Sequence, residues 1–354
     1  MTRVALGLSG GVDSAVAAVL LKEQGYEPVG VFLKMHRAGC EENAARRAAE
    51  ELGIPFVIKD LTALFEERVI RPFAAFYQRG ETPNPCILCN PAVKFRGLSA
   101  AADALGCAKI ATGHYASVAV WGGRHLVRRV CGQEKDQSYM LYGLGEEILS
   151  RLLLPLGSFT QKSAVRGRAG AAGLSAAAKK DSLDICFLAP GQSLPAFIAQ
   201  FSGVRPQPGG ILGEDGALLG THQGICGYTV GQRRGLGVAA EQRLYVTRLD
   251  PEENTVTLGP RESCLATEVF LRGAVWHLPL PEEGLSAKVR YRDRDTPVRA
   301  ELLADQRAVL HFETPKMAPA PGQSAVIYWE NFVLGGGIIE KTEKNPSKKY
   351  KNSK

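Results

Sequence analysis

The chain has 354 residues, of which 45% are hydrophobic and 22% are charged. This composition excludes a disordered chain, and no apolar segment approaches the length that crosses a bilayer. Its 43 Lys and Arg residues exceed its 36 Asp and Glu residues, and the net charge of +7 favours a polyanionic partner. The length predicts two or three domains. Because no secretory signal precedes the first predicted strand, we expect a cytoplasmic protein whose eight cysteines are mostly reduced.

The first third of the chain alternates short apolar runs with helical patterns. The predicted strands are 4–8, 29–34, 56–59 and 109–112, and the predicted helices are 14–24, 42–52, 61–77 and 88–105. This alternation predicts an α/β fold with a doubly wound parallel sheet that is covered on both faces. Such sheets bind ligands at the carboxyl ends of their strands, where Ser9–Ser14, Leu33 and Gly113 emerge.

The run SGGVDS at 9–14 directly follows the first predicted strand. Gly10 and Gly11 allow a sharp turn close to an anion, while Ser9, Ser14 and the free N–H groups of a helix start donate to it. Asp13 is placed to hold Mg²⁺. The run is neither a Walker loop nor a dinucleotide fingerprint. It resembles the SGGxDS loop of the ATP pyrophosphatases, which implies cleavage of ATP between the α- and β-phosphates.

The remaining chain divides by texture. Residues 118–130 predict a hairpin across Gly122 and Gly123, and a basic helical region follows from Ser138 to about Lys179. Closely spaced Gly and Pro residues after Pro190 indicate a compact all-β module, and alternating segments from about Val269 predict a small β-barrel. We therefore expect an α/β domain with a helical extension at 1–190, a central β-domain at 191–262, a barrel at 263–340 and a basic disordered tail at 341–354.

Two thiols lie at a predicted helix start, in the run TPNPCILCN at 82–90. We expect the helix start and Lys94 to lower a thiol pKa and so favour the nucleophilic thiolate of Cys86 or Cys89. A third thiol, Cys186, also follows lysines. The CxxC spacing alone leaves open a redox pair, half of a zinc site or iron–sulfur ligands, and no second CxxC completes a zinc site. For the other cysteines we favour burial: Cys40, Cys107, Cys131, Cys226 and Cys264.

Taken together, the motifs resemble those of the tRNA-specific 2-thiouridylases of the MnmA type, within the PP-loop ATP pyrophosphatase superfamily. The resemblance covers nearly the whole chain and implies a pyrophosphatase domain with a tRNA-binding helical extension, a small central β-domain and a C-terminal β-barrel. The order and spacing of the motifs carry it. These are SGGVDS at 9–14, TPNPC at 82–86, ATGHY at 111–115, KDQSY at 135–139, KDS at 180–182, ICF at 185–187, YTVGQRRGLG at 228–237, RYR at 290–292 and PGQSA at 321–325.

The resemblance assigns ligand contacts to individual positions. It implies ATP contacts at Gly7, Leu8, Ser9, Gly10, Gly11, Val12, Asp13, Ser14, Leu33 and Gly113. It implies contacts to the target base at Asn84, Pro85 and Cys86. It implies tRNA contacts at His114, Lys135, Asp136, Gln137, Arg290, Tyr291 and Gln323. Arg and Lys side chains grip phosphate and Tyr stacks on an unpaired base, so these residue types suit the roles.

The implied reaction is ATP-dependent 2-thiolation of the wobble uridine in tRNAs of the Lys, Glu and Gln type. Adenylation with Mg²⁺ turns the uracil oxygen into a good leaving group. In the family's persulfide scheme Cys186 carries the sulfur, and Cys89 releases it as the nucleophile that forms a disulfide with Cys186. An upstream sulfur donor, either a cysteine desulfurase or a sulfur relay, must load Cys186.

Cys86 departs from the family pattern, because some members carry Asp there as a proposed general base. Two interpretations follow: Cys86 is a spectator, or Cys86, Cys89 and Cys186 ligate an iron–sulfur cluster. Two other functions share part of the pattern. A PP-loop synthetase that adenylates a small molecule explains the loop but neither the thiols nor the barrel, and a non-catalytic RNA-binding protein does not require the intact Ser9–Ser14 loop. Pyrophosphate release that requires tRNA separates the thiolation enzyme from both.

Overall fold

The computed structural model describes residues 1–36, 40–130, 132, 135–179, 185–189 and 191–344. The expected Lys180-Asp181-Ser182 motif, Cys131 and residues 345–354 of the tail lie outside the described residues. The chain forms two compact units. The first contains 1–69, 85–189 and 331–334, and the second contains 70–84, 190–330 and 335–354. In the described part of the chain, no helix combines the length and apolar character needed to cross a membrane.

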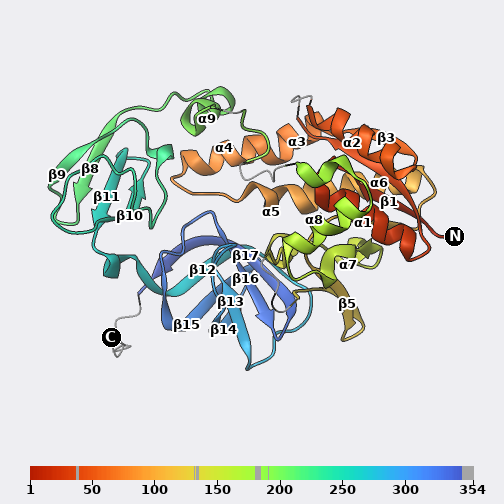
Figure 1. Cartoon of the computed structure of the whole chain (residues 1–354). Helices are drawn as coiled ribbons and strands as arrows, with labels where there is room; N and C mark the ends of the chain where they lie inside the picture. Colours follow the sequence, from red (N-terminus) through yellow and green to blue (C-terminus); the bar gives the residue numbers. More distant parts are fainter. Residues whose placement is uncertain (37–39, 131, 133–134, 180–184, 190, 345–354) are drawn as a thin grey trace. The chain divides into compact units, whose positions relative to one another are not determined.

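The first unit is built on a parallel sheet with strand order β3-β2-β1-β4-β7. Two of its strands, β1 and β3, are labelled in Figure 1. Its strands are β1 (Arg3–Gly7), β2 (Glu27–Lys34), β3 (Phe56–Asp60), β4 (Lys109–Ala111) and β7 (Leu152–Leu153). Val4, Ala5 and Leu6 of β1 are fully buried, as expected for a central strand covered on both faces. The predicted doubly wound sheet is therefore confirmed. The two-residue strand β7 was missed because it is too short to show a periodicity.

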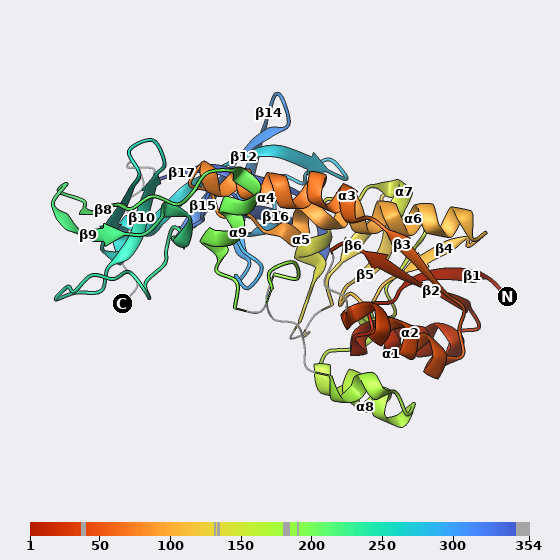
Figure 2. The same ribbon diagram turned by 90° about the horizontal axis from the view of Figure 1, so that it is seen from above.

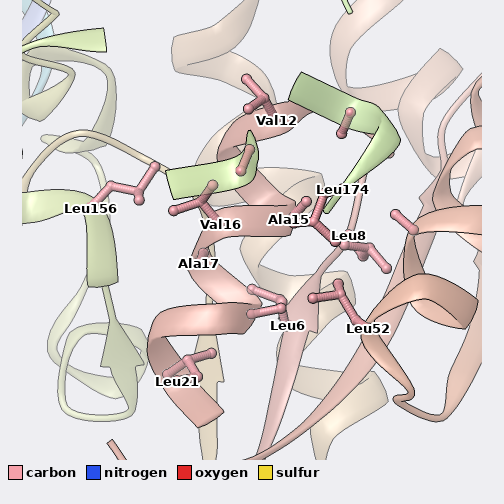
Figure 3. Close-up of a cluster of buried hydrophobic side chains, with 14 of the residues drawn as sticks. Leu6, Leu8, Val12, Ala15, Val16, Ala17, Leu21, Leu52, Leu156 and Leu174 are labelled. Atoms are coloured by element: carbon pink, nitrogen blue, oxygen red, sulfur yellow. The ribbon is translucent and has the colours of Figure 1, made fainter. Parts of the chain in front are cut away.

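Helices cover the two faces of this sheet (Figure 2). Leu6 and Leu8 pack with Ala15, Val16 and other apolar residues of α1 in a core that α2 and α8 complete (Figure 3). The helix α6 packs against β1, β2 and β4. The helices are α1 (Val12–Glu23), α2 (Cys40–Leu52), α3 (Thr62–Phe65), α5 (Pro85–Cys89), α6 (Phe95–Ala104), α7 (Glu146–Leu149) and α8 (Lys162–Ala171). The predicted hairpin is present as β5 (Ser117–Trp121) and β6 (Arg124–Arg128).

Two of the predicted helices are interrupted by single π-helical turns. The predicted helix 61–77 divides into α3, a π turn at Glu66–Ile70 and α4 (Arg71–Gln78). The predicted helix 88–105 divides into α5, a π turn at Asn90–Lys94 and α6. Such turns are frequent at functional sites, and the turn at Asn90–Lys94 directly follows the CxxC motif.

The second unit contains a small β-sheet and a β-barrel, and most strand pairs in both are antiparallel. A four-stranded sheet has the order β10-β11-β8-β9, and six strands close into a barrel in the order β12-β15-β14-β13-β16-β17, with β17 pairing back to β12. The small sheet comprises β8 (Gly209–Gly213), β9 (Leu218–His222), β10 (Tyr245–Asp250) and β11 (Thr255–Gly259). The barrel comprises β12 (Leu265–Trp276), β13 (Leu285–Lys288), β14 (Thr296–Leu303), β15 (Arg307–Met317), β16 (Ser324–Trp329) and β17 (Phe332–Glu343).

Two expectations for this unit need correction. The stretch after Pro190 does not start as all-β, because α9 (Leu194–Ser202) precedes the small sheet. Its Phe197 packs edge-on against Phe73 of α4, a partner that is remote in sequence. The expected disordered tail starts too early, since β17 continues through Glu343 and Lys341 pairs with Glu343.

Candidate active site

The loop between β1 and α1 forms the floor of a pocket. Gly10 has a φ of +70°, and a Cβ on it would lie 2.6 Å from the backbone carbon of Ala44. Only glycine therefore fits at this turn. Ser14 Oγ donates to the carbonyl of Gly11 and lies 3.2 Å from Ser9 Oγ. These contacts fix both hydroxyls at the start of α1, where the helix dipole favours an anion.

The carboxylate of Asp13 is held by two side chains from other parts of the unit. Tyr115 Oη donates to Asp13 Oδ1 at 2.6 Å, and Lys162 Nζ donates to both carboxylate oxygens. The Lys162 ammonium also lies 5.5 Å from the centre of the Tyr115 ring. Lys162 is nearly buried, with a side-chain exposure of 12%. These contacts fix the position of the Asp13 carboxylate in the loop.

The loop after β4 closes against the same helix start. A Cβ on Gly113 would lie 2.7 Å from the backbone carbon of Asp13 and 2.8 Å from the nitrogen of Ser14. Because backbone atoms cannot yield to it, the approach of these two loops requires glycine. The ends of β1, β2 and β4 together surround a pocket of about 250 Å³. Of the predicted ATP contacts, its lining contains Gly7, Leu8, Ser9, Asp13, Ser14, Leu33 and Gly113, and it does not contain Gly10, Gly11 or Val12.

The CxxC thiols lie beside this pocket. Cys89 is buried in α5, and its Sγ contacts the Sδ of Met35 at 3.6 Å. Met35 and Lys94 both line the pocket, so the thiol adjoins the space that the phosphate loop opens. Cys86 and Cys186 are exposed, and none of the three cysteines forms a disulfide. Cys86 and Cys89 are both close enough to Cys186 to raise its pKa.

The expectation that the helix start and Lys94 lower a thiol pKa is wrong for Cys89. Burial raises the pKa of Cys89, and the opposing charge of Lys94 only reduces that effect. Desolvation by the surrounding protein, reinforced by Cys86 and Cys89, raises the pKa of Cys186 to about 12 although its side chain reaches solvent. At neutral pH both groups are therefore thiols. The sequence showed the helix and the lysine but not the burial that outweighs them.

Two of the predicted RNA-contacting residues in the first unit also line the pocket, namely His114 and Gln137. Burial and the charge of Lys94 hold the pKa of His114 well below its usual value, so it is neutral at pH 7. Its Nδ1 lies 2.8 Å from Thr112 Oγ1. Gln137 accepts from the backbone nitrogen of Tyr115 at 2.9 Å. The neighbouring Asp136 accepts from the nitrogen and hydroxyl of Ser138, and Lys135 precedes it on the same segment.

The other predicted RNA contacts belong to the second unit, where Arg290 and Gln323 have internal partners. Arg290 Nη2 donates to the carbonyls of Met317, at 2.8 Å, and Ala318. Gln323 Nε2 donates to the carbonyl of Thr82 at 2.7 Å, and Thr82 donates its N–H to Pro321. Gln323 therefore holds the segment that leads through Asn84 into α5. Tyr291 follows Arg290 in the loop after β13.

Sequence reasoning missed Lys162 as a site residue. It is the first residue of α8, where the positive end of the helix dipole disfavours a cation. A lysine at a helix start is unfavourable unless a carboxylate such as Asp13 balances its charge. This unfavourable position was the signal that the sequence offered. Cys107, Cys226 and Cys264 are buried, as predicted.

The metal predictions fare differently. Asp13 offers one pocket-lining carboxylate, which fits Mg²⁺ that is also bound to phosphate oxygens. In contrast, the part of the chain that the structure describes contains no group of three or more His, Cys, Asp and Glu residues arranged to hold a metal ion. This finding concerns sites for a single metal ion, so the iron–sulfur cluster expected at Cys86, Cys89 and Cys186 stays a prediction, and we derive no step through one.

The family comparisons agree with the fold. Residues 2–190 match the tRNA methyl transferase HUP domain family, residues 196–260 match the tRNA methyl transferase PRC-barrel domain family, and residues 267–339 match the aminomethyltransferase β-barrel domain family. The class that fold and site define is thus a HUP-type α/β protein with a phosphate-binding loop and two β-domains.

Relatives over nearly the full length identify the family. The chain is 41% identical to the tRNA-specific 2-thiouridylase MnmA of Pelotomaculum thermopropionicum over 96% of this chain and 98% of that protein. It is 42% identical to MnmA of Synechocystis sp. and 44% identical to MnmA of Methylobacterium sp., with at least 95% of each chain covered. The chain belongs to the family of tRNA-specific 2-thiouridylases. A solved 4-thiouridine synthetase–RNA complex with bound ATP shares 20% identity over 49% of this chain and 41% of that chain, at a TM-score of 0.33.

Proposed function

We propose that this chain catalyses the ATP-dependent 2-thiolation of the wobble uridine in tRNAs of the Lys, Glu and Gln type. One observation carries the proposal: the pocket opened by the phosphate loop adjoins the thiol of Cys89 through Met35 and Lys94. A site that activates a base with ATP and then delivers sulfur needs both functions side by side. The full-length relatives named as 2-thiouridylases support the same reaction.

The first step activates the base. The O2 oxygen of uracil attacks the α-phosphorus of ATP, the bond from the α-phosphorus to the oxygen that bridges to the β-phosphate breaks, and N3 of the base releases its proton to water. Ser9, Ser14 and the N–H groups at the start of α1 stabilise the departing pyrophosphate. When Mg²⁺ is bound with ATP, it supplies charge neutralisation at the phosphates, and Asp13 is the residue that would hold it.

The second step moves sulfur and balances as an exchange between sulfur atoms. The outer sulfur of a Cys186 persulfide attacks C2 of the base, the C2–O2 bond breaks, and AMP leaves with the former O2 oxygen on its phosphate. The Cys89 thiolate attacks the Sγ of Cys186, which breaks the bond to the transferred sulfur and leaves a Cys89–Cys186 disulfide, while N3 of the base takes up a proton from water. A thiol reductant then restores both thiols, and an upstream sulfur donor reloads Cys186.

The raised pKa of Cys89 sets a requirement on this chemistry. Because the buried thiol is protonated at neutral pH, it must lose its proton as it attacks. Among the described residues, Lys94 carries the positive charge that favours the thiolate of Cys89, and it also lines the nucleotide pocket. We therefore assign Lys94 to both parts of the site. Asn84, Pro85 and Cys86 then contact the target base at the entrance to α5.

The rest of the chain binds the RNA in this proposal. The first domain spans 1–190 with a helical extension, the central β-domain spans 191–262 and the barrel spans 263–340. His114 and the segment Lys135–Gln137 contact tRNA from the first domain, and Arg290, Tyr291 and Gln323 contact it from the barrel. Since His114 is neutral at pH 7, it acts as a hydrogen-bonding or stacking group rather than as a counterion.

The test is nucleoside mass spectrometry of unmodified tRNAs for Lys, Glu and Gln after anaerobic incubation with the full chain, ATP, Mg²⁺ and a persulfide donor. We expect 2-thiouridine, AMP and pyrophosphate, all dependent on tRNA. A matched reaction with an ATP analogue that cannot be cleaved between the α- and β-phosphates should yield no thiolated base. If ATP is cleaved to AMP without tRNA and no thiolated base appears, the proposal is wrong and a small-molecule synthetase replaces it.

A further inference from the structure

The motif YTVGQRRGLG belongs to a segment, residues 228–244, that joins a 3₁₀ turn at Ile225–Gly227 to β10. Three apolar anchors fix this segment on the core of the small sheet. Leu236 is buried with Ile211, Val246, Val256 and Leu258, and Val238 and Leu244 pack against the same cluster. Backbone hydrogen bonds between Gly231 and Val246 and between Val246 and Gln232 close its base. The segment is therefore a fixed feature of the surface rather than a loose loop.

Three arginines lie on the segment, two before the first of these anchors and one directly before the last. Arg233, Arg234 and Arg243 are exposed. Glu241 is the one carboxylate within 228–244, so the segment carries a net charge of +2. Among the residues that the structure describes, none of the three guanidinium groups has a hydrogen-bond or ion-pair partner. The segment thus holds three cations that make no hydrogen bond or ion pair within the described part of the chain.

Three other arginines of the same unit have carboxylate partners. Arg272 makes a two-point ion pair with Glu81, Arg248 pairs with Asp250, and Arg307 pairs with Glu340. In those cases the guanidinium contributes to internal contacts. The arginines of segment 228–244 have no such internal role, so their clustering points to an external anion.

A surface hollow of about 430 Å³ lies between these arginines. Arg233 and Arg243 line it from opposite ends of the segment, together with Gly235 and Gly237. Both glycines have a positive φ and no atom within 4 Å of the position of a Cβ. Glycine is therefore required there for the backbone conformation, and its missing side chains leave the floor of the hollow open to a ligand.

We propose that this hollow binds a phosphodiester of the RNA backbone, with Arg233 and Arg243 as its two guanidinium clamps. The inference rests on the proposed function, which makes tRNA the substrate. Guanidinium forks match phosphate oxygens in geometry and charge, and contacts of this kind position an RNA without reading its bases. Thr229, at the start of the segment, lies 3.1 Å from the hydroxyl of Thr82, four residues before Cys86. A phosphate held here would thus lie on a segment that is tied to the approach to α5.

The test measures tRNA affinity of the full chain, without ATP, at several salt concentrations. We compare wild type with the double variant Arg233→Ala/Arg243→Ala. Each lost phosphate contact lowers the slope of log K against log salt by about 0.7–0.9, so we expect a slope shallower by roughly 1.5 and an affinity lower by about tenfold near 0.1 M salt. The control is Arg248→Ala/Arg307→Ala, which removes the same charge from paired arginines and should change the slope far less.

The outcomes are separable. A double variant with the wild-type slope and an unchanged thermal unfolding midpoint overturns the proposal. So does a variant that binds tRNA normally but accepts sulfur poorly from a protein donor, since the hollow is then a protein-docking site. Because the slope is measured without catalysis, it stands or falls independently of 2-thiouridine formation. Arg233→Lys/Arg243→Lys should keep most of the slope, since the charge remains, and a full loss in this variant would argue against phosphate.

Discussion

The phosphate loop and the thiol group are neighbours in the first unit, yet they are prepared to different degrees. At the loop, Ser9 and Ser14 contact each other, and Asp13 is held by Tyr115 and Lys162. At the thiols, Cys89 is buried against Met35, Cys86 and Cys186 are exposed, and two of the three thiols have raised pKa values. The loop is held by hydrogen bonds within it and from Tyr115 and Lys162, whereas burial raises the pKa of Cys89 and Cys186 above the ordinary value for a thiol.

The difference teaches how the two steps of the proposed reaction can be kept apart. A preorganised loop stabilises charge without reorganisation, which favours adenylation whenever ATP and the base are present. A buried thiol with a raised pKa reacts slowly with small electrophiles, so it is protected until a persulfide is placed beside it. Variants at the loop should therefore impair both steps, while variants at the thiols should impair only the second.

The sharpest test of that separation is Cys186→Ser or Cys89→Ser. Each removes an atom that the sulfur step requires, so 2-thiouridine formation should fall on the order of 10³-fold or more. Pyrophosphate release that requires tRNA should continue in both variants, because the phosphate loop is intact. Cys264→Ser is the matched control, since its buried side chain can still donate to the carbonyl of Val246. Robust multiple turnover by either site variant would remove these cysteines from the mechanism.

A second test breaks the ordered region itself. In Gly113→Ala the new Cβ meets the backbone of Asp13 and Ser14, so the two loops must separate. We expect kcat/KM for both pyrophosphate release and thiolation to fall by roughly 10²-fold, with a stability loss of about 1–3 kcal/mol in denaturant unfolding. Gly145→Ala has open space around its Cβ and an ordinary φ, and should behave like wild type. Equal activity of the two variants would show that the approach of the loops is not needed.

The third test concerns Lys162, which positions Asp13. Lys162→Met frees a carboxylate, so we expect the maximal rate of pyrophosphate release to fall about tenfold while half-saturation moves to lower Mg²⁺. A purely structural role for Lys162 would lower stability without moving the Mg²⁺ dependence. Lys162→Arg should restore part of the rate. Arg168→Met, on the same helix but paired with exposed Glu23, is the control and should change little.

The sequence predicted the ordered region well because its determinants are local. A buried strand, two glycines and a helix start define the phosphate loop, and the parallel order of strands brings Leu33 and Gly113 to it. The partners of Asp13 were less accessible to prediction. Lys162 lies 149 residues away, and only its unfavourable place at the start of α8 hinted at a role.

The thiol region was predicted less well because burial is a property of the whole fold. The spacing of Cys86 and Cys89 placed both thiols in α5, but the desolvation that raises the pKa of Cys89 comes from packing. A local signal was also overlooked, because α9 lies where short strands were expected although Ser193 caps its start and Gly203 ends it in a left-handed conformation. Its Phe197 packs on Phe73 of α4, a contact that the sequence does not show.

The smallest expected effect probes that balance of burial and charge directly. Burial raises the pKa of Cys89 and Lys94 opposes it, so Lys94→Met should raise the pKa further. The thiolate fraction at any fixed pH then falls, and the alkylation profile moves to higher pH. We expect Cys89 to react with iodoacetamide roughly a few-fold more slowly at pH 8, measured by mass spectrometry in a Cys86→Ser background so that one thiol remains on the peptide. Lys94→Arg should keep the wild-type profile, and Lys59→Met, an exposed lysine of β3, is the control. An unchanged profile in Lys94→Met would mean that burial alone sets the pKa of Cys89. In that case only the arrival of the substrate could favour loss of the thiol proton.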